Sequence, residues 1–128
     1  MQTCTHLKAS GVQIPRNPCC EEVAPPNSMR GFPAGFPVDT SRLVENYQMP
    51  IPGQTERVIT YDSTSSAASL RQRYLDWLAA HDYEVVKEKN AEVAASLAAL
   101  NKQQKDLIVL IFPRQSSQGS RVQVITHY

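Results

Sequence analysis

The pattern of apolar and polar positions predicts three strands in the C-terminal part of the chain. Residues 121–126 (RVQVIT) alternate with a period of two, as in a strand with one buried face. Residues 107–112 (LIVLIF) are apolar throughout, which is typical of a strand in the interior of a protein. Residues 83–88 (YEVVKE) are the third candidate strand.

A hairpin is predicted before these strands. Residues 42–51 (RLVENYQMPI) alternate imperfectly, a Pro-Gly turn signal follows, and residues 56–62 (ERVITYD) are rich in β-branched and aromatic side chains. Pro50 has no backbone N–H to donate, so we expect the end of the first strand to lie at a sheet edge or in a bulge.

One helix is predicted over about residues 65–81. The Ser and Thr residues at positions 63–66 offer side-chain oxygens that can cap the first turn. Asp82 stands where a glycine usually takes the left-handed conformation, which Asp tolerates better than most residues do. The apolar residues between these ends recur at helical spacing and define one buried face: Ala67, Leu70, Tyr74, Trp77 and Leu78.

Residues 91–105 allow two interpretations. Their alanines and the apolar spacing of i, i+4, i+7 from Val93 favour a helix, and local propensity alone would choose it. Residues 96–100 also alternate, as a strand paired with residues 107–112 would. Without this segment the predicted order is β-β-α-β-β-β. We therefore predict an α+β fold, with an antiparallel sheet of about five strands and one helix packed on one face.

Proline and glycine are concentrated at the start of the chain. Eight of the nine prolines and four of the five glycines lie within the first 53 residues, and none lies between residues 54 and 112. Both residue types oppose regular structure. Residues 1–31 also lack apolar periodicity, so we predict a flexible, proline-rich lead-in over residues 1–31 and a single α+β domain over residues 32–128.

The length and charge of the chain exclude several classes of protein. A chain of 128 residues has room for one core, and its longest apolar run is too short for a transmembrane segment. With 13 basic and 12 acidic residues, we expect no nucleic-acid partner. The N-terminus lacks the apolar run of a secretory signal, which predicts a cytoplasmic location unless a signal has been removed.

Several packing and turn features follow one another in a set order over about residues 35–126. They are Gly35-Phe36-Pro37-Val38, Tyr61-Asp62-Ser63, Tyr74 with Leu78, Tyr83-Glu84-Val85, and the last two predicted strands. In this order they resemble a family of small bacterial envelope-associated, lipoprotein-like domains of unknown function. Two positions depart from the family's pattern, because Asp82 replaces a turn glycine and Tyr83 replaces a tryptophan.

The resemblance has implications for the fold and the location. It implies that residues 96–102 form a strand and that the single helix crosses one antiparallel sheet. It also implies a location in the cell envelope or periplasm, with a lipid anchor if the chain is exported.

Four residues of the lead-in are candidate metal ligands. Cys4, His6, Cys19 and Cys20 together would supply the four ligands of a zinc site. Their spacing matches no standard zinc motif, and unpaired thiols are the simpler interpretation. The adjacent cysteine pair also lacks the C-x-x-C separation of a redox dithiol. A thiol- or zinc-binding protein therefore remains an alternative function, and no cofactor is predicted.

The pattern of potential catalytic residues does not predict an enzyme. His81 lies in the last turn of the predicted helix, where a cation is favoured by the helix dipole. His127 is so close to the end of the chain that an ordered general base would be hard to hold there. The serines of residues 63–69 are explained by capping, and neither a Gly-x-Ser-x-Gly elbow nor a phosphate-binding glycine loop is present.

Binding is the remaining class of function. A sheet with a helix on one face leaves its other face to be covered. We therefore predict a non-enzymatic binding or structural module that docks another protein or a second copy of itself through a sheet face or edge. The candidate residues of the binding face are Phe32, Phe36, Tyr61 and Tyr83. A small inhibitor or immunity-type protein is a further alternative in the same physical class.

Overall fold

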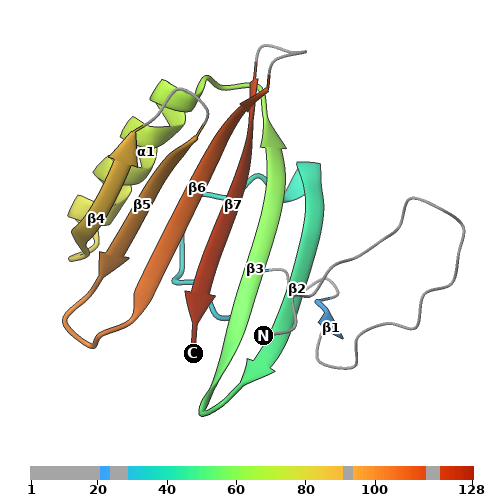
Figure 1. The fold of residues 1–128 in the computed structure, drawn as a ribbon, viewed down its shortest axis with the longest axis vertical. Coiled ribbons are helices and arrows are strands. Elements are labelled where there is room, and N and C mark those ends of the chain that lie inside the picture. Colours follow the sequence, from blue (N-terminus) through green and yellow to red (C-terminus); the bar gives the residue numbers. More distant parts are fainter. Residues whose placement is uncertain (1–20, 24–28, 91–93, 115–118) are drawn as a thin grey trace, which may run out of the picture.

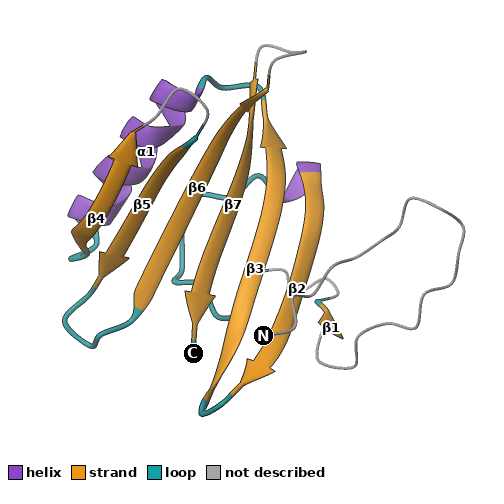
Figure 2. Cartoon of the chain, in the orientation of Figure 1, coloured by secondary structure: helices purple, strands orange, loops and turns teal. Residues whose placement is uncertain are grey.

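The computed structural model describes residues 21–23, 29–90, 94–114 and 119–128. These residues form one antiparallel seven-stranded sheet with a single α-helix (Figures 1 and 2). The elements in chain order are β1 (Glu21–Glu22), a 3-10 turn (Thr40–Arg42), β2 (Leu43–Ile51), β3 (Gln54–Ser63), α1 (Ala67–Ala80), β4 (Glu84–Asn90), β5 (Ala95–Leu100), β6 (Asp106–Arg114) and β7 (Gly119–His127). Across the sheet the order is β1-β2-β3-β7-β6-β5-β4.

The predicted α+β class is confirmed, but the sheet has seven strands where about five were predicted. One additional strand is β1, which lies in the predicted lead-in and pairs Glu21 with Gln48 and Glu22 with Tyr47 of β2. The other is β5, which lies between β4 and β6. For residues 95–100 the helical interpretation is therefore wrong.

Tertiary pairing explains why residues 95–100 form a strand in spite of their alanines. Ala95, Leu97 and Ala99 alternate as buried residues on the helix-facing side of β5. Both neighbouring strands supply hydrogen-bond partners for the backbone of β5. Helix propensity differs between residue types by less than about 1 kcal/mol per residue, so burial and pairing outweigh it.

Helix α1 begins and ends close to the predicted positions. Ser66 caps its first turn, with the Ser66 Oγ accepting a hydrogen bond from the Ser69 N–H at 3.1 Å. Beyond its last residue, Asp82 takes the left-handed conformation with a φ of 63°. The buried residues of α1 are Leu70, Tyr74 and Leu78, which belong to the predicted apolar face. The local sequence thus sets both ends and the buried face of the helix.

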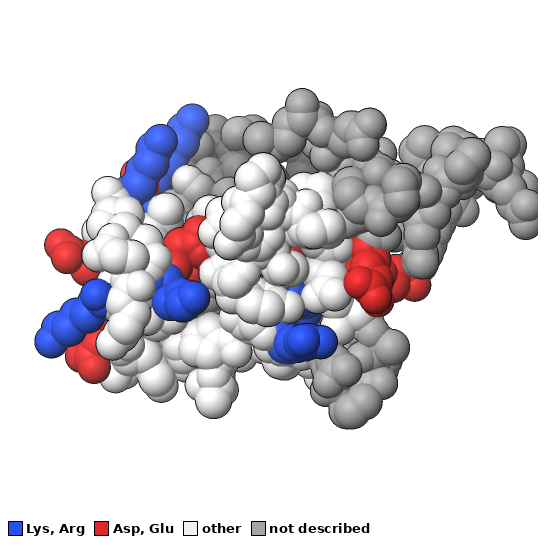
Figure 3. Space-filling model, turned by 90° about the horizontal axis from the view of Figure 1, so that it is seen from below, with Lys and Arg blue, Asp and Glu red and all other residues white. Residues whose placement is uncertain are grey.

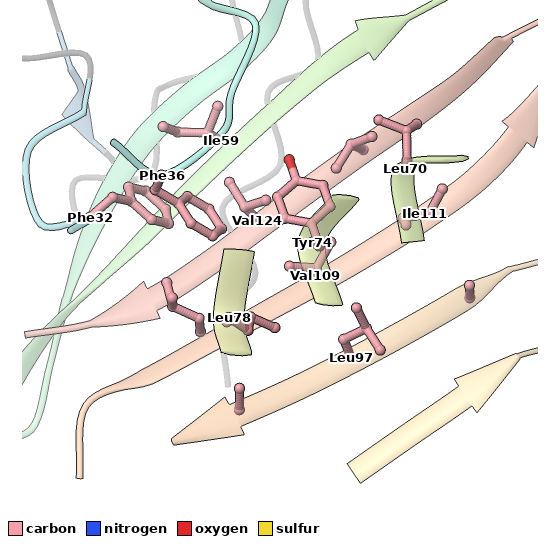
Figure 4. Packing of buried hydrophobic residues seen from close by; sticks show 14 of the residues in the cluster. Phe32, Phe36, Ile59, Leu70, Tyr74, Leu78, Leu97, Val109, Ile111 and Val124 are labelled. Atoms are coloured by element: carbon pink, nitrogen blue, oxygen red, sulfur yellow. The ribbon is translucent and has the colours of Figure 1, made fainter. Parts of the chain in front are cut away.

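Helix α1 covers only part of one face of the sheet. It contacts β4, β5 and β6, alongside which it runs in Figure 1. Residues 29–39, here called the strap, cover the neighbouring area of the same face. Figure 4 shows Phe32 and Phe36 of the strap beside Ile59 of β3 and Val124 of β7. Met29 also packs against this core, so core contacts begin before the domain boundary predicted at residue 32.

Candidate functional site

The candidate zinc ligands Cys4, His6, Cys19 and Cys20 lie outside the described residues. Within the described ranges, no group of three or more His, Cys, Asp or Glu side chains is arranged to hold a metal ion.

The four candidate binding-face residues do not form a common exposed surface. Phe32, Phe36 and Tyr61 are only 8%, 4% and 3% exposed and belong to the core between the strap, α1 and the sheet. Phe32 and Phe36 stack with ring centroids 5.6 Å apart, and Phe36 meets the ring of Trp77 edge-on at 5.1 Å. Tyr83 is half-buried, with its ring centroid 5.9 Å from that of Trp77.

Two buried tyrosines join the helix, the sheet and the strap. The hydroxyl groups of Tyr61 and Tyr74 hydrogen-bond to each other, and the Tyr74 hydroxyl also donates to the Pro37 carbonyl oxygen at 2.6 Å. Burial raises the pKa of both hydroxyl groups above the ordinary value for tyrosine. They therefore remain protonated at neutral pH and serve as structural hydrogen-bond donors.

Arg57 is a fully buried cation on the same face of the sheet. Its Nε donates to the Arg30 carbonyl oxygen at 2.6 Å and its Nη1 donates to the Tyr47 carbonyl oxygen at 2.7 Å. Its guanidinium carbon lies 5.5 Å from the centroid of the Phe32 ring. Burial lowers the pKa of Arg57 to about 10, so the side chain stays charged at neutral pH. The position of Arg57 two residues before Ile59 in an alternating strand could have indicated that it faces the core.

The face of the sheet opposite α1, here called the outer face, carries an apolar area. Within the described ranges, α1 and the strap both lie on the other face. Toward β2 and β3 the outer-face residues Met49, Val58 and Thr60 are buried. The accessible apolar area lies over β5, β6 and β7, where Phe112 is 39% exposed and its neighbours are half-buried. Its residues are Ala98, Leu100, Ile108, Leu110, Phe112 and Ile125, assigned to this face by strand register.

Charged side chains on the outer face are segregated along the strand direction. The end at which β6 finishes carries Arg114 and Arg121, whereas the opposite end carries Glu56, Glu84 and Asp106. Lys87 and Lys89 of β4 lie between these ends, level with Ile108 and Leu110. The basic end also contains Asp62, which is paired with both arginines, at 3.2 Å from Arg114 and 2.8 Å from Arg121. Seen from the end of the sheet at which β6 begins, acidic and basic side chains are interspersed (Figure 3).

His127 lies at the acidic end between two carboxylates. Its Nδ1 is 2.6 Å from Asp106 Oδ2 and its Nε2 is 3.1 Å from Glu56 Oε1. Its backbone N–H also donates to Asp106 Oδ1 at 2.9 Å. Burial alone would lower the pKa of His127, but the hydrogen bonds to Asp106 and Glu56 outweigh it and raise this pKa above its ordinary value.

The ordered position of His127 was not predicted from the sequence. Pairing with Glu56 of β3 fixes the backbone of this residue, although it lies next to the end of the chain. The partner carboxylates are 71 and 21 residues away in the sequence, so local patterns could not find them. Because both ring nitrogens face carboxylates, neither is free to act as a general base.

Comparison of the chain with protein-family models, curated proteins and solved structures gives no match. Within the described part of the chain, no helix has the length and apolar character needed to cross a membrane.

Proposed function

We propose that this chain is a non-enzymatic module that associates with a second copy of itself through the outer face. The observation that carries the proposal is the accessible apolar area over β5, β6 and β7, which no described helix or strap covers. Contiguous apolar patches rimmed by polar residues are typical of interaction sites. Both ring nitrogens of His127 contact carboxylates, and the hydroxyl groups of Tyr61 and Tyr74 are buried and protonated. These contacts support a module that carries out no catalysis.

The strand edges are less suited to docking than the outer face. β4 forms one edge of the sheet, and a bulge lies between Val85 and Lys87. Most of β4 is charged and exposed, a combination that discourages pairing with another strand. At the other edge, β1 is already paired with part of β2. These features favour a face-to-face contact over extension of the sheet.

The charge arrangement favours a second copy as the occupant. Most homodimers have two-fold symmetry, in which the same patch of both subunits forms the interface. A two-fold axis that lies in the interface and crosses the strands reverses the strand direction of the second copy. With the axis over Leu110, Asp106 of one copy then faces Arg114 of the other, and apolar area meets apolar area.

Replacing Leu110 with glutamate tests this proposal. Leu110 is half-buried at the centre of the apolar area, between Ser96 and Gln123 on the neighbouring strands. Leu110→Glu would place a charge in the contact, so we expect the dimer dissociation constant to rise roughly tenfold or more. The measurement is sedimentation equilibrium, with a thermal melt to verify folding.

The matched control introduces the same charge on the other side of the molecule. Ala68 is exposed in the first turn of α1, where a carboxylate is compatible with the helix dipole. We expect Ala68→Glu to associate as the parent chain does. Equal association of the parent and Leu110→Glu would contradict the proposal. If the parent is monomeric and a variant lacking residues 1–20 associates, the first 20 residues are the occupant and the second copy is not.

A further inference from the structure

We infer that Gln123 sets the alignment of the two sheets in this dimer, by pairing with Gln123 of the second copy across the two-fold axis. The inference rests on the proposed self-association and identifies a specificity-determining residue at the centre of its interface.

Gln123 is a polar residue within the apolar area of the outer face. On β7 it lies two residues before Ile125, on the same face, and it pairs with Leu110 of β6. It is half-buried, and its Nε2 donates to Thr60 Oγ1 at 3.3 Å. No other hydrogen bond of this side chain is found among the described residues. Since a carboxamide has two N–H donors and an acceptor oxygen, one N–H and the oxygen remain for a further partner.

Strand register places Gln123 in a row that crosses the sheet. The row consists of Thr60 on β3, Gln123 on β7, Leu110 on β6 and Ser96 on β5. A two-fold axis that lies over Leu110 and crosses the strands runs along this row, so each of its residues meets its own copy. Two carboxamides related in this way can exchange a pair of N–H···O hydrogen bonds. The Ser96 hydroxyl can likewise donate to its copy or accept from it.

The charged residues that continue this row lie outside the apolar area. Lys89 of β4 is exposed, so its two copies can turn into the solvent, where like charges repel weakly. Glu45 of β2 lies three strands away from Leu110. At the centre of the contact, by contrast, an amide without a partner would lose its hydrogen bonds to water. The central polar group therefore decides which alignment is favoured.

Slipped alignments of the two sheets are less favourable. Because side chains alternate with a period of two, a slip of two residues keeps the same faces in contact. In one direction this slip puts Gln123 over Ile125 of the second copy, which buries the amide against an apolar side chain. In the other direction it puts Ile108 over Arg114 of the second copy. A single polar residue in an apolar interface fixes the register of coiled coils in a similar way.

A charge-swap experiment tests whether Gln123 meets its own copy. Gln123→Glu and Gln123→Lys each bring two like charges together at the axis, so we expect the dissociation constant of each homodimer to rise about tenfold or more. In an equimolar mixture the two opposite charges meet, and we expect a heterodimer whose dissociation constant is within about threefold of the parent's. Native mass spectrometry, with one variant labelled with heavy nitrogen, identifies the species, and sedimentation equilibrium measures the dissociation constants.

Two further pairs of variants complete this experiment. Ala68→Glu and Ala68→Lys place the same charges on α1, on the other side of the molecule, and we expect no preference for the heterodimer. Ser96→Glu and Ser96→Lys lie in the same row as Gln123, on the other side of Leu110, and are expected to prefer the heterodimer. Thermal melts show which variants fold. If the charged variants of Gln123 do not fold, the Ser96 pair decides the outcome.

Gln123→Leu tests whether the amide pair sets the alignment. Leucine needs no hydrogen-bond partner, so we expect the dissociation constant of this variant to fall roughly threefold or more while slipped dimers become accessible. A slip of two residues places Ser96 over Ala98 of the second copy and separates like charges at this position. In the Gln123→Leu background, the penalty for the Ser96→Glu homodimer is therefore expected to shrink to about threefold or less.

The outcomes distinguish this inference from the proposed function. Absence of a dimer of the parent chain would refute both together. A dimer in which the deciding charge-swap pair shows no preference for the heterodimer would overturn the inference and leave the proposed function standing. An undiminished penalty for Ser96→Glu in the Gln123→Leu background would have the same consequence.

Discussion

Replacing Arg57 with alanine is expected to lower the free energy of unfolding by about 3–5 kcal/mol, because it removes a large buried side chain and leaves buried acceptors unpaired. The side chain is fully buried and donates to the carbonyl oxygens of Arg30 and Tyr47. It also lies over the ring of Phe32, so the loss would loosen the strap from β3. Urea denaturation monitored by circular dichroism measures this change.

Arg57→Met separates the charge of the side chain from its volume. Methionine retains much of the apolar stem but donates no hydrogen bond and needs no desolvated charge. We expect it to recover about half of the stability lost in the alanine variant, because burying a cation is itself costly. An alanine variant within about 1 kcal/mol of the parent would show that Arg57 does not hold the strap.

Replacing Tyr74 with alanine is the second change with a large expected effect, a loss of about 3–5 kcal/mol. The ring packs against Phe36 with centroids 5.5 Å apart, and its hydroxyl reaches the Pro37 carbonyl oxygen. Tyr74→Phe keeps the ring and removes only the hydroxyl, and we expect it to cost about 1–3 kcal/mol. The free energies of unfolding are compared by urea denaturation.

A double-mutant cycle tests whether the two buried hydroxyl groups act together. Tyr61→Phe, Tyr74→Phe and the combined variant remove the hydrogen bond between the rings singly and jointly. Because the groups are in direct contact, the two losses should not add, and a coupling of about 0.5–3 kcal/mol is expected. Strict additivity would mean that the contact between the hydroxyl groups contributes nothing to stability.

The elements that the sequence predicted are those whose signals are local. Helix α1 follows from a capping serine, a spaced apolar face and Asp82 within a short stretch. β7 was predicted from its regular alternation, and Val122 and Val124 on one side of it are buried. β5 was ambiguous because its alanines favour a helix in isolation, and only the pairing with β4 and β6 decides its structure.

The candidate site was harder to predict because its members are distant in sequence. Aromatic residues of the strap were expected at a binding surface, yet Phe32 and Phe36 are buried beside Ile59. A large aromatic residue in a segment without periodicity gives no indication of which face of a sheet it will cover. The outer face and the cluster around His127 exist only once β3, β6 and β7 are aligned, and no short motif encodes that alignment.

The pairing of β3 with β7 has a consequence for the order of folding. β4, β5, β6 and β7 are joined by successive short connections, and β2 and β3 form a separate local hairpin. The β3–β7 contact instead joins residues about 60 positions apart, such as Thr60 and Gln123. Closing so long a segment of chain costs entropy before its contacts form, so the docking of the hairpin onto β7 is expected to limit the folding rate.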